Sequence, residues 1–125
     1  AGIENPRAEL AMAEVHDCFT PTELVLMEDL GFSARGEAWR DIEAGAFDLH
    51  GDLPVNTDGG LKSFGHPVGA SGLRMLFECW LQLRGEAPDD RQIDTVDRGL
   101  ALTHNLGGYP GEMVSFVGIW GNRKG

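Results

Sequence analysis

One histidine of this sequence stands inside a run of glycines, at the point where an apolar segment begins. The stretch Gly59–Gly72 reads GGLKSFGHPVGASG, with His66 in its middle. Glycine lets the backbone take positive φ angles and come close to a ligand, and Pro67 stiffens the chain after the histidine. A helix that starts next aims its N-terminal amides back at the loop. The segment is therefore suited to hold an imidazole beside an anion, although composition alone favours a simple Gly/Pro-rich connector.

Two more histidines occupy comparable places. His16 ends the apolar run Leu10–His16 just before a helix start, and His104 ends the apolar run Leu100–His104 before a glycine-rich segment. Because imidazole titrates near neutral pH, three such rings at one cavity would suit general acid–base chemistry. We predict that His16, His66 and His104 share one site. The residues expected to contact its ligand are Phe64, Gly65, Asn105, Gly107, Gly108 and Tyr109.

A metal site is not expected. No set of His, Cys, Asp and Glu has the spacing of metal ligands, and the consecutive residues His16, Asp17 and Cys18 cannot all point at one ion from a strand end.

The elements that must position these residues can be predicted from periodicity. Thr20, Pro21 and Glu23 form a capping-box pattern that predicts a helix start, and Gly31 is a natural residue to follow its end. Residues Ser33–Phe47 predict a short irregular helix anchored by Trp39. Residues 48–60 predict a loop with two turns, at His50-Gly51 and Asp58-Gly59.

The second half of the chain predicts one helix and two strands. Leu73 to Leu83 carry apolar residues on two stripes, which predicts a helix buried between two sheets, with Cys79 in the core. Leu100–His104 and Met113–Ile119 predict antiparallel strands joined by the segment 105–111. We therefore expect one α/β domain over residues 1–125, with a mixed sheet and flanking helices.

Composition limits the function. The 125 residues carry a formal net charge of −10 with a pI near 4.6, which argues against nucleic-acid binding because that relies on neutralising phosphates. Neither a signal peptide nor an apolar run of membrane-spanning length is visible, so we expect a soluble cytoplasmic protein with no membrane contact. Cys18 and Cys79 suggest a reducing compartment, although one disulfide between them stays possible.

The glycine-rich stretch closely resembles the GGxxxxGHPxGxSG motif of the thiolase superfamily. In that family the histidine that matches His66 lies beside a reactive cysteine, helps to activate it and contributes to an oxyanion hole. His16–Phe19 reads HDCF and resembles the sterol-carrier-protein type of thiolase, which implies an oxyanion-stabilising role for His16. Asp17 and Cys18 have a structural interpretation, as a carboxylate that satisfies helix amides and a small buried thiol. His104 stands where other thiolases have a Cys-x-Gly motif, which implies proton transfer.

This resemblance implies the C-terminal half of a thiolase fold, a mixed sheet with one buried helix and surface helices. The implied reaction is acyl transfer between coenzyme A thioesters, by Claisen condensation or thiolysis, with the thioester as substrate and no bound cofactor. The nucleophilic cysteine belongs to the N-terminal half, so this fragment is expected to need that half as its partner and to form a homo-oligomer. Cations expected to meet the phosphates of coenzyme A are Lys62, Arg74, Arg123 and Lys124.

Two alternatives stay open. The first is a thiolase-fold retro-aldolase that cleaves a coenzyme-A-linked steroid-type side chain, usually with an OB-fold zinc-ribbon partner; Tyr109 would be its acid or base, or only an aromatic residue of the turn. The second is a non-catalytic relative that binds acyl-CoA or lipid.

Overall fold

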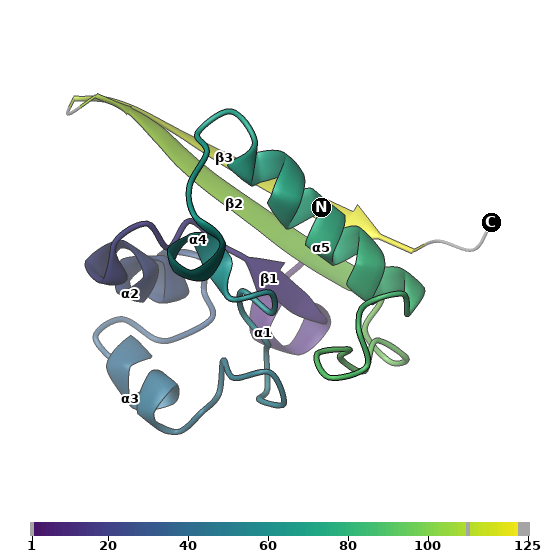
Figure 1. Ribbon diagram of the computed structural model, residues 1–125. Coiled ribbons are helices and arrows are strands. Elements are labelled where there is room, and N and C mark those ends of the chain that lie inside the picture. The colour runs from purple at the N-terminus through teal and green to yellow at the C-terminus, as the bar shows by residue number, and fades with distance from the viewer. Residues whose placement is uncertain (1, 110, 123–125) are drawn as a thin grey trace.

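The computed structural model describes residues 2–109 and 111–122 and consists of a three-stranded mixed sheet with helices on both faces (Figure 1). The strand order is β1-β2-β3, with β1 parallel to β2 and β3 antiparallel to β2, as the mixed sheet predicted from the sequence requires. The elements are α1 (Pro6–Glu9), β1 (Met12–Glu14), α2 (Thr20–Asp29), α3 (Ala38–Glu43), α4 (Gly60–Phe64), α5 (Ser71–Arg84), β2 (Leu100–Tyr109) and β3 (Glu112–Gly121).

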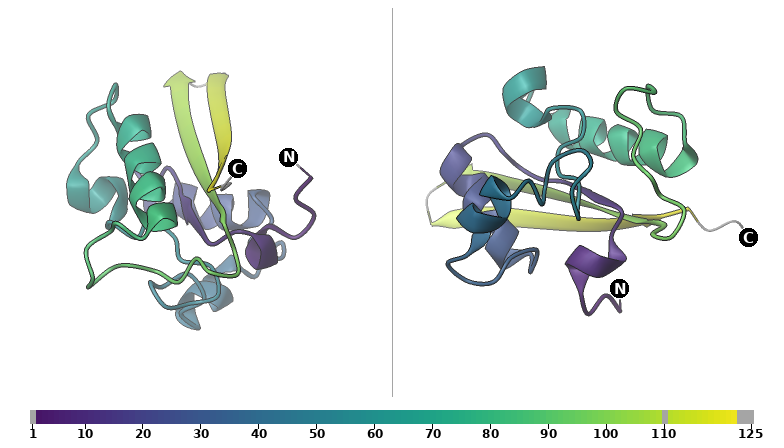
Figure 2. Two further views of the ribbon diagram at one scale, coloured as in Figure 1. Left: turned by 90° about the vertical axis from the view of Figure 1, so that its right-hand side faces the viewer. Right: turned by 90° about the horizontal axis from the view of Figure 1, so that it is seen from below.

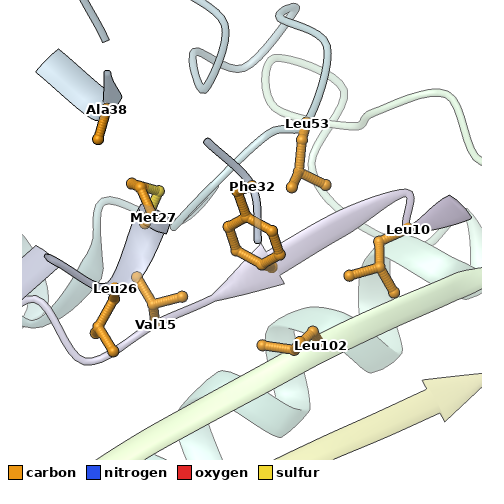
Figure 3. Packing of buried hydrophobic residues seen from close by; sticks show 9 residues of the cluster. Leu10, Val15, Leu26, Met27, Phe32, Ala38, Leu53 and Leu102 are labelled. Carbon is orange, nitrogen blue, oxygen red and sulfur yellow. The ribbon is translucent and has the colours of Figure 1, made fainter. Parts of the chain in front are cut away.

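The alternation of side chains along the strands produces two cores, one on each face of the sheet. On the face of α2, a cluster includes Val15, Phe32 and Leu102, and Figure 3 shows Phe32 in the middle of its labelled side chains. On the opposite face, a second cluster joins Ala101 of β2 to Cys79 of α5. Figure 2 shows α5 running along this face, with α1 and α2 on the other side of the hairpin. The strands therefore present one set of residues to each layer.

The predicted start of α2 is correct to within one residue, but its capping box is wrong. The N-cap residue is Phe19, and it makes no side-chain capping bond. Thr20 instead accepts a hydrogen bond from Lys62 Nζ at 3.1 Å, and Glu23 accepts one from Asn56 Nδ2 at 3.2 Å. Thr20 and Glu23 are therefore hydrogen-bonded to residues outside the helix and do not cap its N-terminus. Gly31 follows the helix end, as predicted.

Between α2 and α4 the chain is less regular than the predicted helix. Only Ala38–Glu43 is helical, and Trp39 is not the anchor of this region, because its side chain is 49 % exposed and lies under the guanidinium of Arg40. The smaller Phe32 takes that place in the core. The following loop contains Val55, which forms an isolated parallel bridge with Ala13 of β1. This loop thus lies along the edge of the sheet.

Helix α5 has the predicted position but not the predicted burial. Its buried face includes the polar residues Glu78 and Gln82 together with Cys79, whereas the side chains of Leu73, Phe77 and Trp80 are exposed. The prediction of a helix buried between two sheets is wrong for this chain, because the described residues form a single sheet that covers one side of the helix. The prediction that Cys79 is a core residue is confirmed.

The hairpin of β2 and β3 is longer than the two predicted strands. Both strands have ten residues, so most of the predicted connecting segment 105–111 is strand, and Pro110 lies outside the described residues. The tip projects beyond the helices in Figure 1. Cys18 and Cys79 are both free thiols. Among the described residues, none of the helices combines the length and the apolar character needed to cross a bilayer.

Candidate active site

Two of the three predicted histidines are in contact. His16 lies two residues beyond β1 and is buried, and its ring meets the ring of His66 edge to face, with centroids 5.0 Å apart and planes at 83°. The two residues are fifty positions apart in the sequence. They meet because the end of β1 and the glycine-rich segment after α4 lie together at the start of α5. We call His16 and His66 the histidine pair.

The hydrogen bonds of His66 indicate which of its ring nitrogens carries the proton. Its Nδ1 atom lies 2.7 Å from the hydroxyl oxygen of Ser71, and that hydroxyl donates to the carbonyl of Pro67 at 3.2 Å. Since a hydroxyl has a single proton, Nδ1 of His66 donates to Ser71, and Nε2 keeps its lone pair. His66 is exposed on its loop. The arrangement therefore presents a base to the outside of the chain.

Asp17 fixes the glycine-rich segment to the end of β1. Its Oδ1 atom accepts a hydrogen bond from the amide of Leu61 at 2.7 Å, and the carboxylate is buried. Gly60, with φ +68°, lies so close to it that a Cβ atom would come within 2.7 Å of Asp17 Cγ. This contact agrees with the structural role expected for Asp17. Cys18 is half-buried, and so is less buried than the structural interpretation expects.

Burial keeps two of the histidines neutral near pH 7. The pKa of His16 is lowered mainly by burial and further by the charge of His66, while hydrogen bonding with Asn105 and the charge of Asp17 oppose the shift. Burial also lowers the pKa of His104, with a smaller effect from the charge of His16. Neutral imidazoles can accept protons or donate hydrogen bonds, which is the behaviour required of bases and oxyanion donors.

His104 is close to the histidine pair but faces the other way. Its Nε2 atom lies 3.0 Å from the hydroxyl of Ser115, and its ring lines a groove of about 600 Å³ between α2 and the hairpin, with Val25 and Val117 among the walls. The next residue, Asn105, faces α5, where its Nδ2 atom lies 3.2 Å from Met75 Sδ. This groove is lined by His104 and not by either ring of the histidine pair, although His16 is near enough for its charge to affect His104.

The remaining predicted contact residues divide into two groups. Phe64 and Gly65 directly precede His66, and Phe64 is exposed. Gly107, Gly108 and Tyr109 belong to the far end of β2, where Tyr109 pairs with Glu112 and its side chain is 79 % exposed. At about 3.3 Å per residue, Tyr109 lies roughly 16 Å along the strand from His104. This end of the hairpin is separate from the histidine pair.

The four cations predicted to meet the phosphates of coenzyme A differ in whether their charges are available. The side chain of Arg74 is 15 % exposed and forms ion pairs with Asp58 and Glu14, so it is not available to a phosphate and that prediction is wrong. Lys62 is exposed but lies 3.7 Å from Glu23. Arg123 and Lys124 lie outside the described residues. Within residues 2–109 and 111–122, no group of three or more His, Cys, Asp and Glu side chains is arranged to hold a metal ion.

A cluster of buried carboxyl groups beneath the site was not predicted from the sequence. Glu14 and Glu78 are fully or almost fully buried, and Arg74 and Arg91 contact them or their neighbours. One sequence signal was available: Glu78 falls on the apolar stripe of α5 beside Cys79, where a solvated carboxylate is not expected.

The mixed sheet, the helix α5 and the glycine-rich segment with His66 together are typical of one family of proteins. The chain belongs to the thiolase C-terminal domain-like family, whose model matches residues 1–118.

Particular relatives give the comparison more detail. The chain is 46 % identical to an acetyl-CoA acetyltransferase of Methanothermobacter thermautotrophicus over 103 residues, which are 82 % of this chain and 26 % of that protein. It is 41 % identical to sterol carrier protein 2 of Bos taurus over 101 residues, 80 % of this chain and 18 % of that protein. The chain thus spans about a quarter or less of these relatives.

A solved structure resembles the fold. The structure named "Ltp2-ChsH2(DUF35) aldolase" matches with a TM-score of 0.70 and 31 % sequence identity, over 94 % of this chain and 28 % of that one. The family and fold predicted from the sequence are confirmed by these matches.

Proposed function

We propose that this chain is part of the C-terminal half of a thiolase-type enzyme that joins or cleaves acyl groups of coenzyme A thioesters. The observation that carries the proposal is the histidine pair. His66 presents an unprotonated Nε2 atom at the surface of the chain, and the neutral ring of His16 lies against it. The acetyl-CoA acetyltransferase similar to this chain supports the same reaction class.

In the direction of condensation, the first step forms an acyl-enzyme. Nε2 of His66 takes the proton of a cysteine thiol supplied by the N-terminal half, and the thiolate adds to the carbonyl carbon of an acyl-CoA. The C–S bond to coenzyme A then breaks, and the leaving thiolate takes the proton from His66. Hydrogen bonds from the histidine pair stabilise the oxyanion, an effect commonly worth about 3–4 kcal/mol per donor.

The second step forms the carbon–carbon bond. His104, neutral because its pKa is lowered, takes a proton from C2 of a second acyl-CoA. The resulting carbanion attacks the acyl carbonyl, the cysteine thiolate leaves, and the proton passes from His104 back to cysteine. Thiolysis is the reverse of both steps. Since His104 lines the groove on the α2 side, the scheme requires the second acyl-CoA to reach this groove.

The proposal is tested in the full-length protein by the rate of thiolysis of acetoacetyl-CoA, followed by loss of its absorbance. His66→Ala should lower turnover by at least about 100-fold, since a positioned general base contributes about 10²–10⁴. His50 is an exposed histidine of the loop after α3, so His50→Ala is the matched control and should leave turnover unchanged. Near-normal turnover in His66→Ala would refute the assigned role.

One observation favours a second candidate, a thiolase-fold aldolase. The solved structure that resembles this chain is named as an aldolase with a second component, ChsH2(DUF35), and Tyr109 is exposed on the hairpin. Under this alternative, an OB-fold zinc-ribbon protein would be the partner, and Tyr109 would act as acid or base. The full-length protein would then be inert towards acetoacetyl-CoA and a thiol, and Tyr109→Phe would abolish cleavage of a β-hydroxyacyl-CoA.

A further inference from the structure

Arg74 connects three segments that support the histidine pair. It lies in the first turn of α5, and its guanidinium is paired with Asp58 and lies 3.6 Å from Glu14 Oε2. The same guanidinium lies over the ring of Phe64, 5.3 Å from its centroid. These partners come from the turn before α4, from β1 and from the end of α4.

The positions of these partners relative to the histidines give Arg74 its importance. Glu14 precedes His16 by two residues, and Phe64 precedes His66 by two residues. Asp58 directly precedes the two glycines, and its Oδ1 atom accepts a hydrogen bond from the amide of Gly60 at 3.0 Å. Arg74 therefore contacts both ends of α4 and the strand that leads to His16.

The electrostatics of this cluster depend on the guanidinium. Glu14 is completely buried, and burial raises its pKa to about 8 even though the positive charge of Arg74 opposes the shift. The side chain of Asp58 is 3 % exposed. Buried carboxyl groups without a partner are strongly destabilising, because removing one member of a buried pair leaves an uncompensated charge. Without Arg74, Asp58 would move towards solvent and take the start of α4 with it.

We infer that Arg74 is a positioning residue for His66 and His16. Its guanidinium holds the segment 58–64 against β1 at both ends, so that the rings of the two histidines meet. Its effect on turnover rests on the proposed function, whereas its effect on the segment 59–72 does not.

The test compares substitutions of two partly buried arginines in the full-length protein. Arg74→Met removes the guanidinium but keeps much of the side-chain length, and Arg74→Lys keeps the charge but loses the planar group that lies over Phe64. Arg91→Met is the matched control, because Arg91 pairs with buried Glu78 at the other end of the same cluster. Each variant is assayed for kcat and KM, for thermal stability, and for hydrogen exchange of peptides covering residues 59–72.

Arg74→Met should lower kcat at least about tenfold with KM changed less than about twofold, because misplacing a catalytic group by 1 Å can cost on the order of 10² in rate. Hydrogen exchange of residues 59–72 should become faster in the same variant, and Arg74→Lys should give intermediate values of both. Arg91→Met should lower thermal stability but leave kcat and the hydrogen exchange of residues 59–72 at the wild-type level.

Two results would overturn the inference. One is unchanged hydrogen exchange of residues 59–72 in Arg74→Met, and the other is an equal loss of kcat in Arg74→Met and Arg91→Met, which would indicate a general loss of stability. If the wild-type protein itself shows no thiolysis, the proposed function fails, but the hydrogen-exchange comparison still decides whether Arg74 holds the segment. If Arg74→Met does not fold, the same comparison is made with Arg74→Lys.

Discussion

Substituting Gly60 by alanine should destabilise this protein more than substituting another glycine of the same backbone conformation. Gly60 has φ +68° and Gly85 has φ +69°, so both substitutions place an L-residue in the left-handed region. That conformation costs roughly 1–2 kcal/mol per residue. A Cβ atom on Gly85 would meet no atom within 4 Å, so Gly85→Ala should cost about 1 kcal/mol and nothing more.

At Gly60 a second cost is added. Its Cβ atom would lie 2.7 Å from Cγ and 2.9 Å from Oδ1 of Asp17, so the carboxylate must move. Moving it breaks the buried 2.7 Å hydrogen bond from the amide of Leu61. Hydrogen bonds to charged groups contribute about 1.5–3 kcal/mol. The sum for Gly60→Ala is therefore about 3–4 kcal/mol of unfolding free energy, about 2 kcal/mol or more above Gly85→Ala.

Urea denaturation followed by circular dichroism measures both costs from the shift in midpoint at a constant slope. The cause is then checked in an Asp17→Ala background, where the clash is absent and Gly60→Ala should cost no more than Gly85→Ala. Coupling of this kind is expected between residues in contact and not between distant ones. Equal costs of the two glycine substitutions in the wild-type background would refute the assigned role of Asp17 in holding the loop.

Two further predictions concern ionisation. Titration of the histidine ring protons by NMR should give His16 a pKa below 6.5, and His66→Gln should raise it because the charge of His66 is one cause of the shift; an unchanged value would contradict the contact between the rings. Glu14 has a pKa raised to about 8 from 4.5, so the folded state holds its proton longer than the unfolded state. Its contribution to stability is present at pH 4.5 and lost as the pH rises through 8. The difference in unfolding free energy between wild type and Glu14→Gln should therefore change over this range, and a constant difference would show that Glu14 does not titrate there.

The local elements of this fold could be predicted because their signals are local. The periodicity of residues 73–83 predicts α5, and the two apolar runs near the C-terminus predict the hairpin, whose antiparallel pairing is confirmed. The strand-end and glycine-loop positions of three histidines predict one shared site, and two of the three, His16 and His66, are in contact. The sequence alone does not predict which side chains of a strand point to which face of the sheet. His104 and Asn105 are neighbours, and one residue of register decides which of them meets α5.

The buried charges were missed for a related reason. A carboxylate in a sequence is normally solvated, so Glu14 within β1 and Glu78 within α5 contradict their surroundings until their partners are known. Arg74 and Arg91, which make those positions tolerable, lie 60 and 13 residues away. The sequence alone therefore predicts that Arg74 is a cation available to the phosphates of coenzyme A. Only the packing of α5 on β1 shows that its charge is used inside the protein.

Because the pKa of His16 is lowered, its ring is neutral near pH 7, and this limits the positive charge on the histidine pair. If both rings were protonated, two positive charges would lie about 5 Å apart, one of them on the buried ring of His16. Burial of His16 prevents this, because it lowers the pKa of that ring and keeps it neutral. In the proposed function, His66 would take a proton from a thiol while the ring beside it is uncharged. The proposed function therefore assigns the proton transfer to His66, whose ring is held by Ser71 and whose segment is held by Asp17 through the amide of Leu61.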